Sequence, residues 1–201
     1  MKIENISQLR ALYDLPNERA TKKQIATLDV HARSFINKSP FAILATYNHQ
    51  GQVDASPRGG KPGFVKILNE QQIMLPDAKG NNRLDSMTNI LDTGRIGLLF
   101  LIPGVDETLR INGSAGIYTN KELLDQFTTE NNPPKTCILV TIEEVFLHCA
   151  KALMRSGLWL QESIINRDEF PTMGQMLKDQ IGLQGIPESQ QAMLKRYQKD
   201  L

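Results

Sequence analysis

Four short segments typical of β-strands follow one another between residues 41 and 76 with only turns between them. Residues 41–48 (FAILATYN) precede 52–59 (QVDASPRG), and residues 63–68 (GFVKIL) precede 72–76 (QIMLP). Each pair has the length and spacing of a β-hairpin, and the first has its turn near Asn48–Gly51. A doubly wound parallel sheet needs a helix after each strand, so this succession favours an antiparallel sheet.

The remaining segments extend this pattern. Residues 95–102 and 107–118 form a third strand pair, and residues 135–150 form a long strand. With about six or seven strands in hairpin order, a closed or nearly closed barrel would remove exposed sheet edges. Helices are expected at 7–15, 27–39, 83–92, 120–129 (with Asn120 as its cap), 151–159 and 188–200.

Composition limits the kinds of protein that this chain can be. It has 201 residues, 40% hydrophobic and 22% charged, which is typical of a soluble globular protein. A net charge of +1 argues against a broad nucleic-acid-binding surface, and no apolar run is long enough to span a bilayer. The first residues contain no apolar signal core, so we expect a cytoplasmic protein, with its two cysteines as reduced thiols.

The segment GNNRLDS, residues 80–86, lies between a strand and a helix. Its ordinary interpretation is a helix start capped by an asparagine, with Asp85 and Ser86 in or near the first turn. The free N–H groups of a helix start also attract phosphate. Asn82, Arg83 and Ser86 would add hydrogen bonds to such an anion.

A second cationic segment, SPRGGKPG, covers residues 56–63. It is either a glycine-rich hairpin connection with two solvated cations, Arg58 and Lys61, or a second contact to a phosphate, with Ser56, Arg58 and Gly59 as the candidate residues. Two basic, glycine-flanked segments on successive elements favour an anion site more than either does alone.

A third cationic segment, CAKALMRSGLW, covers residues 149–159. Lys151 and Arg155 are four residues apart and share a helix face, with Trp159 following. This pattern is typical of a solvated helix face anchored by a tryptophan. It would equally form the edge of a site for a planar anionic ligand.

The histidines and cysteines do not assemble a metal site or a hydrolase site. His148 and Cys149 are neighbours on a strand and point to opposite faces, so we expect no metal. The chain has no Walker A loop and no GxGxxG motif after a strand.

Taken together, these motifs resemble the pyridoxamine 5′-phosphate oxidase-like proteins, over roughly residues 28–160. The chain is similar to a branch of FMN-binding split-barrel proteins, distinct from the true oxidase, that carries SPRGGKPGFVKIL, LPDAKGNNRLDSMTNIL, GLLFLIPGVDETLRINGSA and HCAKALMRSGLW in this order. The fold class implied is mainly β (α+β). It is a six-stranded antiparallel split β-barrel with peripheral helices, forming a homodimer with FMN at the subunit interface.

The resemblance also implies roles for particular residues. Arg58 matches the arginine that binds the FMN phosphate, and Asn82, Arg83 and Ser86 lie where the family's second phosphate contact begins. Thr108 and Arg110 match a strand motif that approaches the cofactor. Lys151, Arg155 and Trp159 are candidates for contacts from the second subunit. The chain would form one domain over 1–201, with its core at about 28–160, a helical N-terminal segment at 1–37 and a helical tail at 161–201.

The implied function is that of an FMN-dependent oxidoreductase acting on a small molecule. The C-terminal Arg-Leu-His-Asp-Arg motif of the oxidase is absent, so pyridoxamine 5′-phosphate is not the expected substrate. No catalytic residue is assigned. Two alternatives stay open: a non-catalytic flavin- or haem-binding protein, in which His148 would matter for haem, and a deazaflavin-dependent reductase on the same barrel.

Overall fold

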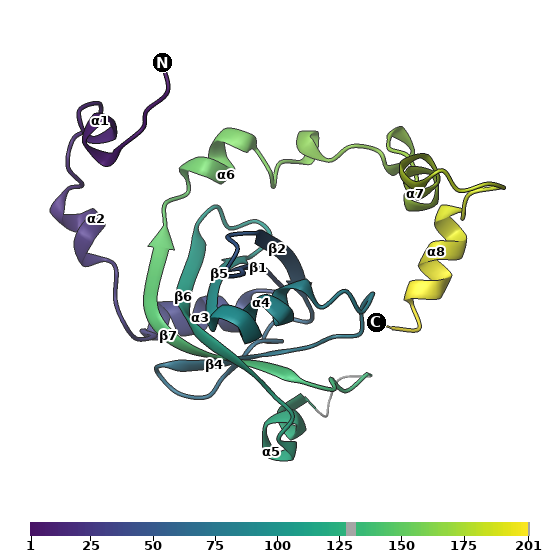
Figure 1. Cartoon of the computed structure of the whole chain (residues 1–201), viewed down its shortest axis with the longest axis horizontal. Coiled ribbons are helices and arrows are strands. Elements are labelled where there is room, and N and C mark those ends of the chain that lie inside the picture. Colours follow the sequence, from purple (N-terminus) through teal and green to yellow (C-terminus); the bar gives the residue numbers. More distant parts are fainter. Residues whose placement is uncertain (128–131, 201) are drawn as a thin grey trace.

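The computed structural model describes residues 1–127 and 132–200, and its centre is one antiparallel sheet (Figure 1). The strand order is β2-β1-β5-β6-β7-β4-β3. The strands are β1 (Phe41–Tyr47), β2 (Val53–Gly59), β3 (Lys66–Ile67), β4 (Gln72–Pro76), β5 (Arg95–Leu101), β6 (Thr108–Tyr118) and β7 (Cys137–His148). The three expected hairpins β1–β2, β3–β4 and β5–β6 are all present.

Two details of the expected barrel are wrong. The described sheet has seven strands rather than six, because the two-residue β3 adds to its end, and the strand order is open, with β2 and β3 as its edges. The sheet is curved, and the β6–β7 pair contributes to this through a register shift between Asn112 and Gly113, since a bulge bends a strand pair.

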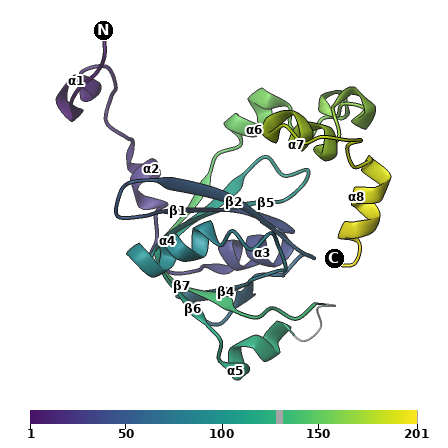
Figure 2. The ribbon, with the colours of Figure 1, turned by 45° about the vertical axis from the view of Figure 1, so that its right-hand side comes forward.

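Alternation along the strands places one face of the sheet in the core. Leu98 and Phe100 of β5, and Leu109 and Ile111 of β6, are buried. Successive side chains of a strand point to opposite faces, so the residues between them lie on the outward face of the sheet. Figure 2 shows α3 and α4 lying between the β1–β2–β5 part of the sheet and the β4–β6–β7 part.

The helices agree with the sequence in position more than in length. They are α1 (Ile6–Arg10), α2 (Glu18–Lys22), α3 (Val30–Lys38), α4 (Asp85–Thr93), α5 (Lys121–Leu124), α6 (Lys151–Ser156), α7 (Met173–Ile181) and α8 (Gln190–Tyr197). Sequence reasoning gave no separate bounds for α2 and α7, which lie within the helical segments expected at 1–37 and 161–201. Asn120 precedes α5 as expected, but its side chain makes no capping hydrogen bond. The last two residues of the helix expected at 120–129 lie outside the described residues.

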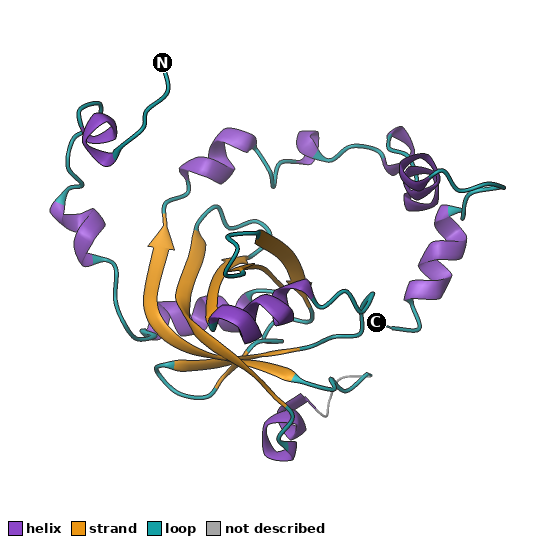
Figure 3. Cartoon of the chain, in the orientation of Figure 1, coloured by secondary structure: helices purple, strands orange, loops and turns teal. Residues whose placement is uncertain are grey.

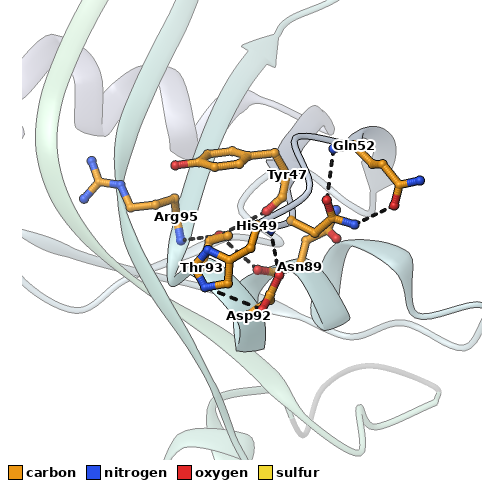
Figure 4. A network of polar contacts seen from close by, with 8 residues as sticks. Tyr47, His49, Gln52, Asn89, Asp92, Thr93 and Arg95 are labelled. Carbon is orange, nitrogen blue, oxygen red and sulfur yellow. Dashed lines mark hydrogen bonds and ion pairs between the residues drawn. The ribbon is translucent and has the colours of Figure 1, made fainter.

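Polar contacts fix the C-terminal half of α4 against the β1–β2 hairpin (Figure 4). Asp92 accepts a 2.8 Å hydrogen bond from the backbone N–H of His49, and the Thr93 hydroxyl donates to the Tyr47 carbonyl at 3.1 Å. The buried Asn89 amide donates to the Thr46 hydroxyl at 3.0 Å. With this end fixed, the N-terminal end of α4 is held beside β2.

The terminal helices lie outside the curved sheet (Figure 3). The N-terminal part is tied to β7 by a backbone bridge in which Ile25 and Val145 exchange hydrogen bonds of 3.0 and 2.7 Å. After β7, the Trp159 indole donates to the Val105 carbonyl at 3.0 Å. None of the helices in residues 1–127 and 132–200 has both the length and the apolar character to span a membrane.

Candidate functional site

A cavity of about 590 Å³ lies between β2 and the start of α4, and we call it the α4 pocket. Two further segments complete its wall: the loop from Asp77 to Leu84 and the residues before β7. It falls within the range of ligand pockets, ~300–1,000 Å³. Its lining includes Asp54, Ser56, Arg58, Asp77, Lys79, Asn82, Arg83, Asp85, Ser86 and Lys135. Five predicted residues, namely Ser56, Arg58, Asn82, Arg83 and Ser86, therefore share one cavity.

The start of α4 is open toward this cavity. The residue before its first turn is Leu84, with φ 59°, and no side chain makes a capping hydrogen bond there. The interpretation of an asparagine-capped helix is therefore wrong: Asn82 lies two residues earlier, also with φ 59°. The first N–H groups of an α-helix have no partner within the helix, so an uncapped start lining a pocket favours an anion.

Ser86 is held in place by a neighbouring carboxylate. The residue is 2% exposed, and its hydroxyl donates to Asp54 Oδ2 at 2.5 Å. This bond links α4 to β2. It also commits the hydroxyl proton to Asp54, so in this arrangement Ser86 positions the two elements rather than offering its proton to a ligand.

Arg58 enters the pocket wall from the end of β2. Its Nε is shielded from solvent and has no hydrogen-bond partner among the described residues. An unpaired buried donor costs about 1–3 kcal/mol, so such a group indicates a missing partner. A ligand oxygen in the adjoining cavity would supply one.

Arg83 is engaged differently. Its Nε donates to Asp85 Oδ2 at 2.7 Å, and the side chain is largely exposed. The hydrogen bond and charge of Asp85 raise the pKa of the Arg83 guanidinium above its usual value. Arg83 is thus a charge at the pocket that is already shared with an acidic neighbour.

Thr108 and Arg110 lie elsewhere. They alternate with the buried Leu109 and Ile111, so they occupy the outward face of the sheet and do not line the α4 pocket. The Arg110 guanidinium pairs with Glu144 and lies 4.8 Å from the centre of the Phe146 ring. Its Nε is buried and has no partner in the described part of the chain.

The other predicted residues also lie off the pocket within this chain. Gly59 ends β2 without contributing to the lining. Lys151 and Arg155 are exposed on α6, and Trp159 follows them with its indole on Val105.

Two lysines of the pocket were missed by sequence reasoning. Lys79 belongs to the segment LPDAKGNNRLDS, so its position next to GNNRLDS was a usable signal. Lys135 comes from the residues before β7, and nothing local in its sequence indicated the pocket. It has no ion-pair or hydrogen-bond partner among residues 1–127 and 132–200.

His148 does not belong to a metal cluster. No group of three or more potential metal-binding side chains occurs in the described portion of the chain. The His148 ring packs edge-on against Phe146, with ring centres 4.6 Å apart. Burial, together with the charges of Arg110 and Lys23, lowers the pKa of His148 below its usual value.

Comparison with known proteins agrees with this architecture. A family model described as pyridoxamine 5′-phosphate oxidase matches residues 28–149. The chain is similar to the crystal structure of HupZ from Group A Streptococcus, at 18% identity over 60% of this chain and 93% of HupZ, with a TM-score of 0.51. At that identity the similarity shows the fold alone.

A second solved structure comes from Clostridium acetobutylicum and is described as related to general stress protein 26, of the pyridoxinephosphate oxidase family. It is 12% identical over 59% of this chain and 86% of that chain, with a TM-score of 0.46. No curated protein sequence matches the chain.

Proposed function

We infer a function from the premise that this chain belongs to the pyridoxamine 5′-phosphate oxidase family. We propose that the chain binds FMN, with the FMN phosphate in the α4 pocket. Proteins of this family typically bind flavins. The observation that carries the proposal is the coincidence, in one cavity, of the unpaired Arg58 Nε with the uncapped start of α4.

The residues of the pocket suit a phosphate in complementary ways. Arg58 would pair its guanidinium with phosphate oxygens, and the first N–H groups of α4 would donate to the same group. Asp54 keeps Ser86 in position through their hydrogen bond. Lys79 and Lys135 add positive charge to the same cavity.

β2 is suited to hold the rest of the cofactor. It is an edge strand, so the backbone groups on its outer side have no partner within the sheet. Pro57, in the middle of β2, lacks an N–H, which an edge strand tolerates. The remaining free N–H groups would bond to the flavin ring and orient it.

We further propose that two copies of the chain pair through the outward face of the sheet. Phe41, Tyr47 and Val53 are exposed large apolar side chains on that side of β1 and β2. A dimer on this face would bury them, and it would bring Lys151, Arg155 and Trp159 of one subunit toward the cofactor of the other. Thr108 and Arg110 lie on the same face.

The activity that fits these features is FMN-dependent oxidation or reduction of a small molecule. When bound, the flavin supplies the redox chemistry, while the protein binds, orients and shields it. No side chain of the pocket is assigned as a general acid or base. Lys151 and Arg155 are the residues proposed to contact an anionic substrate or the carbonyl edge of the flavin.

The test is FMN titration of the purified protein, followed by the same titration of Arg58→Ala. Loss of charge-assisted hydrogen bonds worth about 1.5–3 kcal/mol should raise the Kd roughly ten- to one-hundredfold. Arg10→Ala, an exposed arginine on α1, is the matched control and should bind as the parent does.

Riboflavin and a deazaflavin cofactor, titrated in parallel, separate the alternatives. FMN should bind at least tenfold more tightly than riboflavin because only FMN has the phosphate. Equal affinity for FMN and riboflavin, or an Arg58→Ala protein with unchanged Kd, would overturn the phosphate assignment. Preference for the deazaflavin would replace FMN with that cofactor.

A further inference from the structure

We call residues 160–200 the C-terminal arm. The arm extends away from the sheet after α6, and its last described residue contacts the loop before α4. The arm contains α7 and α8, which pack on each other, and it curves away from the body of the molecule. Figures 1 and 2 both show the end of the chain lying beside the loop that precedes α4.

A single polar link holds the end of this arm. Lys79 Nζ pairs with Asp200 Oδ1 at 2.5 Å, across 121 residues of sequence. Within the described parts of the chain, no other hydrogen bond or ion pair joins residues 160–200 to residues 1–149. Among the described residues, the other side-chain hydrogen bonds and ion pairs of the arm, such as that of Arg196 with Glu188, are internal to it.

The body residue of this link is also a residue of the proposed binding site. Lys79 lines the α4 pocket, whereas Asp200 does not, so the carboxylate reaches the ammonium from outside the cavity. Lys79 is therefore a residue of the pocket wall that is paired with a carboxylate of the arm.

We propose that Asp200 competes with an anionic ligand for Lys79: the Lys79–Asp200 pair holds the C-terminal arm beside the α4 pocket, and binding of the ligand releases it. The identity of that ligand rests on the proposed function, but the competition does not. The Lys79 side chain is 64% exposed and that of Asp200 34%. Exposed ion pairs are weak, worth ~0–1 kcal/mol, so a phosphate group in the pocket can displace the carboxylate.

Amide hydrogen exchange of α8 in the full chain tests this competition. The proteins are the parent, Lys79→Gln, Asp200→Asn, the double variant, and Asp179→Asn. The control Asp179 is a carboxylate of the same arm whose side chain, among the described residues, accepts a hydrogen bond from Gln175 within α7 at 2.8 Å and makes no other. Without ligand, Lys79→Gln and Asp200→Asn should each accelerate exchange in α8 about two- to fivefold, the factor expected from an exposed pair.

The double variant should exchange no faster than either single variant, because both remove the same contact. Inorganic phosphate, added at constant ionic strength, should accelerate exchange of α8 in the parent but not in Asp200→Asn. Phosphate should also bind Asp200→Asn about two- to fivefold more tightly than it binds the parent, and Lys79→Gln more weakly.

Unchanged exchange of α8 in both single variants would overturn the proposal, as would phosphate that binds the parent without affecting α8. The ligand-free comparison does not involve FMN. If the variants and phosphate act as expected but FMN fails to bind, the competition stands and the FMN assignment falls. If Arg58→Ala weakens FMN binding while the exchange of α8 is the same in Lys79→Gln as in the parent, the FMN assignment stands and the competition falls.

Discussion

Asn82 and Leu84 hold the loop before α4 in a conformation that few side chains adopt. Both have φ 59°, the left-handed region. Asparagine enters this region more readily than most residues, while leucine does so at a cost of about 1 kcal/mol or more. Such strain persists where the surrounding structure holds it, and it is frequent at ligand sites. Here it directs the open end of α4 into the pocket.

The residue type at position 82 should therefore affect stability in the absence of any ligand. Asn82→Ala should lower the free energy of unfolding by about 0.5–1 kcal/mol, since alanine enters the left-handed region less readily than asparagine. Asn82→Gly should not, because glycine adopts this φ without strain. Urea unfolding at constant pH compares the two variants. Equal loss in both would show that the side chain of Asn82, not its backbone, is what matters.

His148 couples stability to pH. Its pKa is lowered by burial and by Arg110 and Lys23, so the unfolded chain binds a proton more readily than the folded one. The folded state therefore loses stability as the pH falls below about 6.5, the usual histidine pKa, and the loss levels off below the folded pKa.

His148→Gln should remove this contribution. Between pH 7.5 and 5, roughly spanning the usual histidine pKa, the free energy of unfolding of the parent should fall more than that of the variant. Chemical unfolding at a series of pH values measures the difference. His31→Gln, on α3, is the control, and a parallel decline in all three proteins would refute the assignment.

At the scale of elements, the β6–β7 pair decides how far the sheet curves. The register shift lies between Asn112 and Gly113. A Cβ built on Gly113 would come within 2.1 Å of the Thr141 carbonyl oxygen. The backbones of β6 and β7 are therefore too close at this position to accommodate a side chain. Glycine here allows the close approach of the strands at the bulge.

Gly113→Ala should consequently destabilise the protein by about 1–3 kcal/mol, since neither backbone can yield without shifting the pair. Thermal or urea unfolding measures this. Gly59→Ala, where an added Cβ would find its nearest atom at 3.5 Å, serves as the control and should be close to neutral. A Gly113→Ala protein as stable as the parent would mean that the strands separate there at little cost.

At the scale of the whole molecule, the two faces of the sheet differ in what covers them: helices pack on the inner face, and the outward face is open in a single chain. α3 and α4 fill the inside of the curve (Figure 2), whereas the outward face carries apolar side chains beside Arg110 and Glu144. Ile43 lies on that face, between Pro57 of β2 and Leu99 of β5. A second copy of the chain on this face would complete the proposed cofactor site.

Ile43→Lys should then dissociate the dimer, because an unpaired charge buried at an interface costs several kcal/mol. Light scattering after size-exclusion chromatography should show the parent as a dimer and the variant with a Kd for self-association at least ~100-fold higher. Val30→Lys, an exposed position on α3, should remain dimeric. A parent that is monomeric at high concentration would contradict the proposed dimer.

The sequence alone determined the hairpin order, the turn near Asn48–Gly51 and a helix expected at 83–92, which the structure has at Asp85–Thr93. It also identified the two cationic segments at 56–63 and 80–86. These features depend on neighbours a few residues apart: alternation, a turn glycine, and a helical pattern after a polar loop. The placement of Arg58, Asn82 and Ser86 around one cavity was expected from the family resemblance, which assigns the end of β2 and the start of α4 to the same phosphate.

Only the tertiary structure decided the open, seven-stranded order, the pairing of Arg110 with Glu144, and the entry of Lys135 into the pocket. It alone placed Asp200 on Lys79. Each joins residues far apart in sequence, and no local pattern specifies which distant side chains will meet. Those meetings depend on how β6 and β7 bend and how the helices pack inside the curve, which is a property of the whole chain.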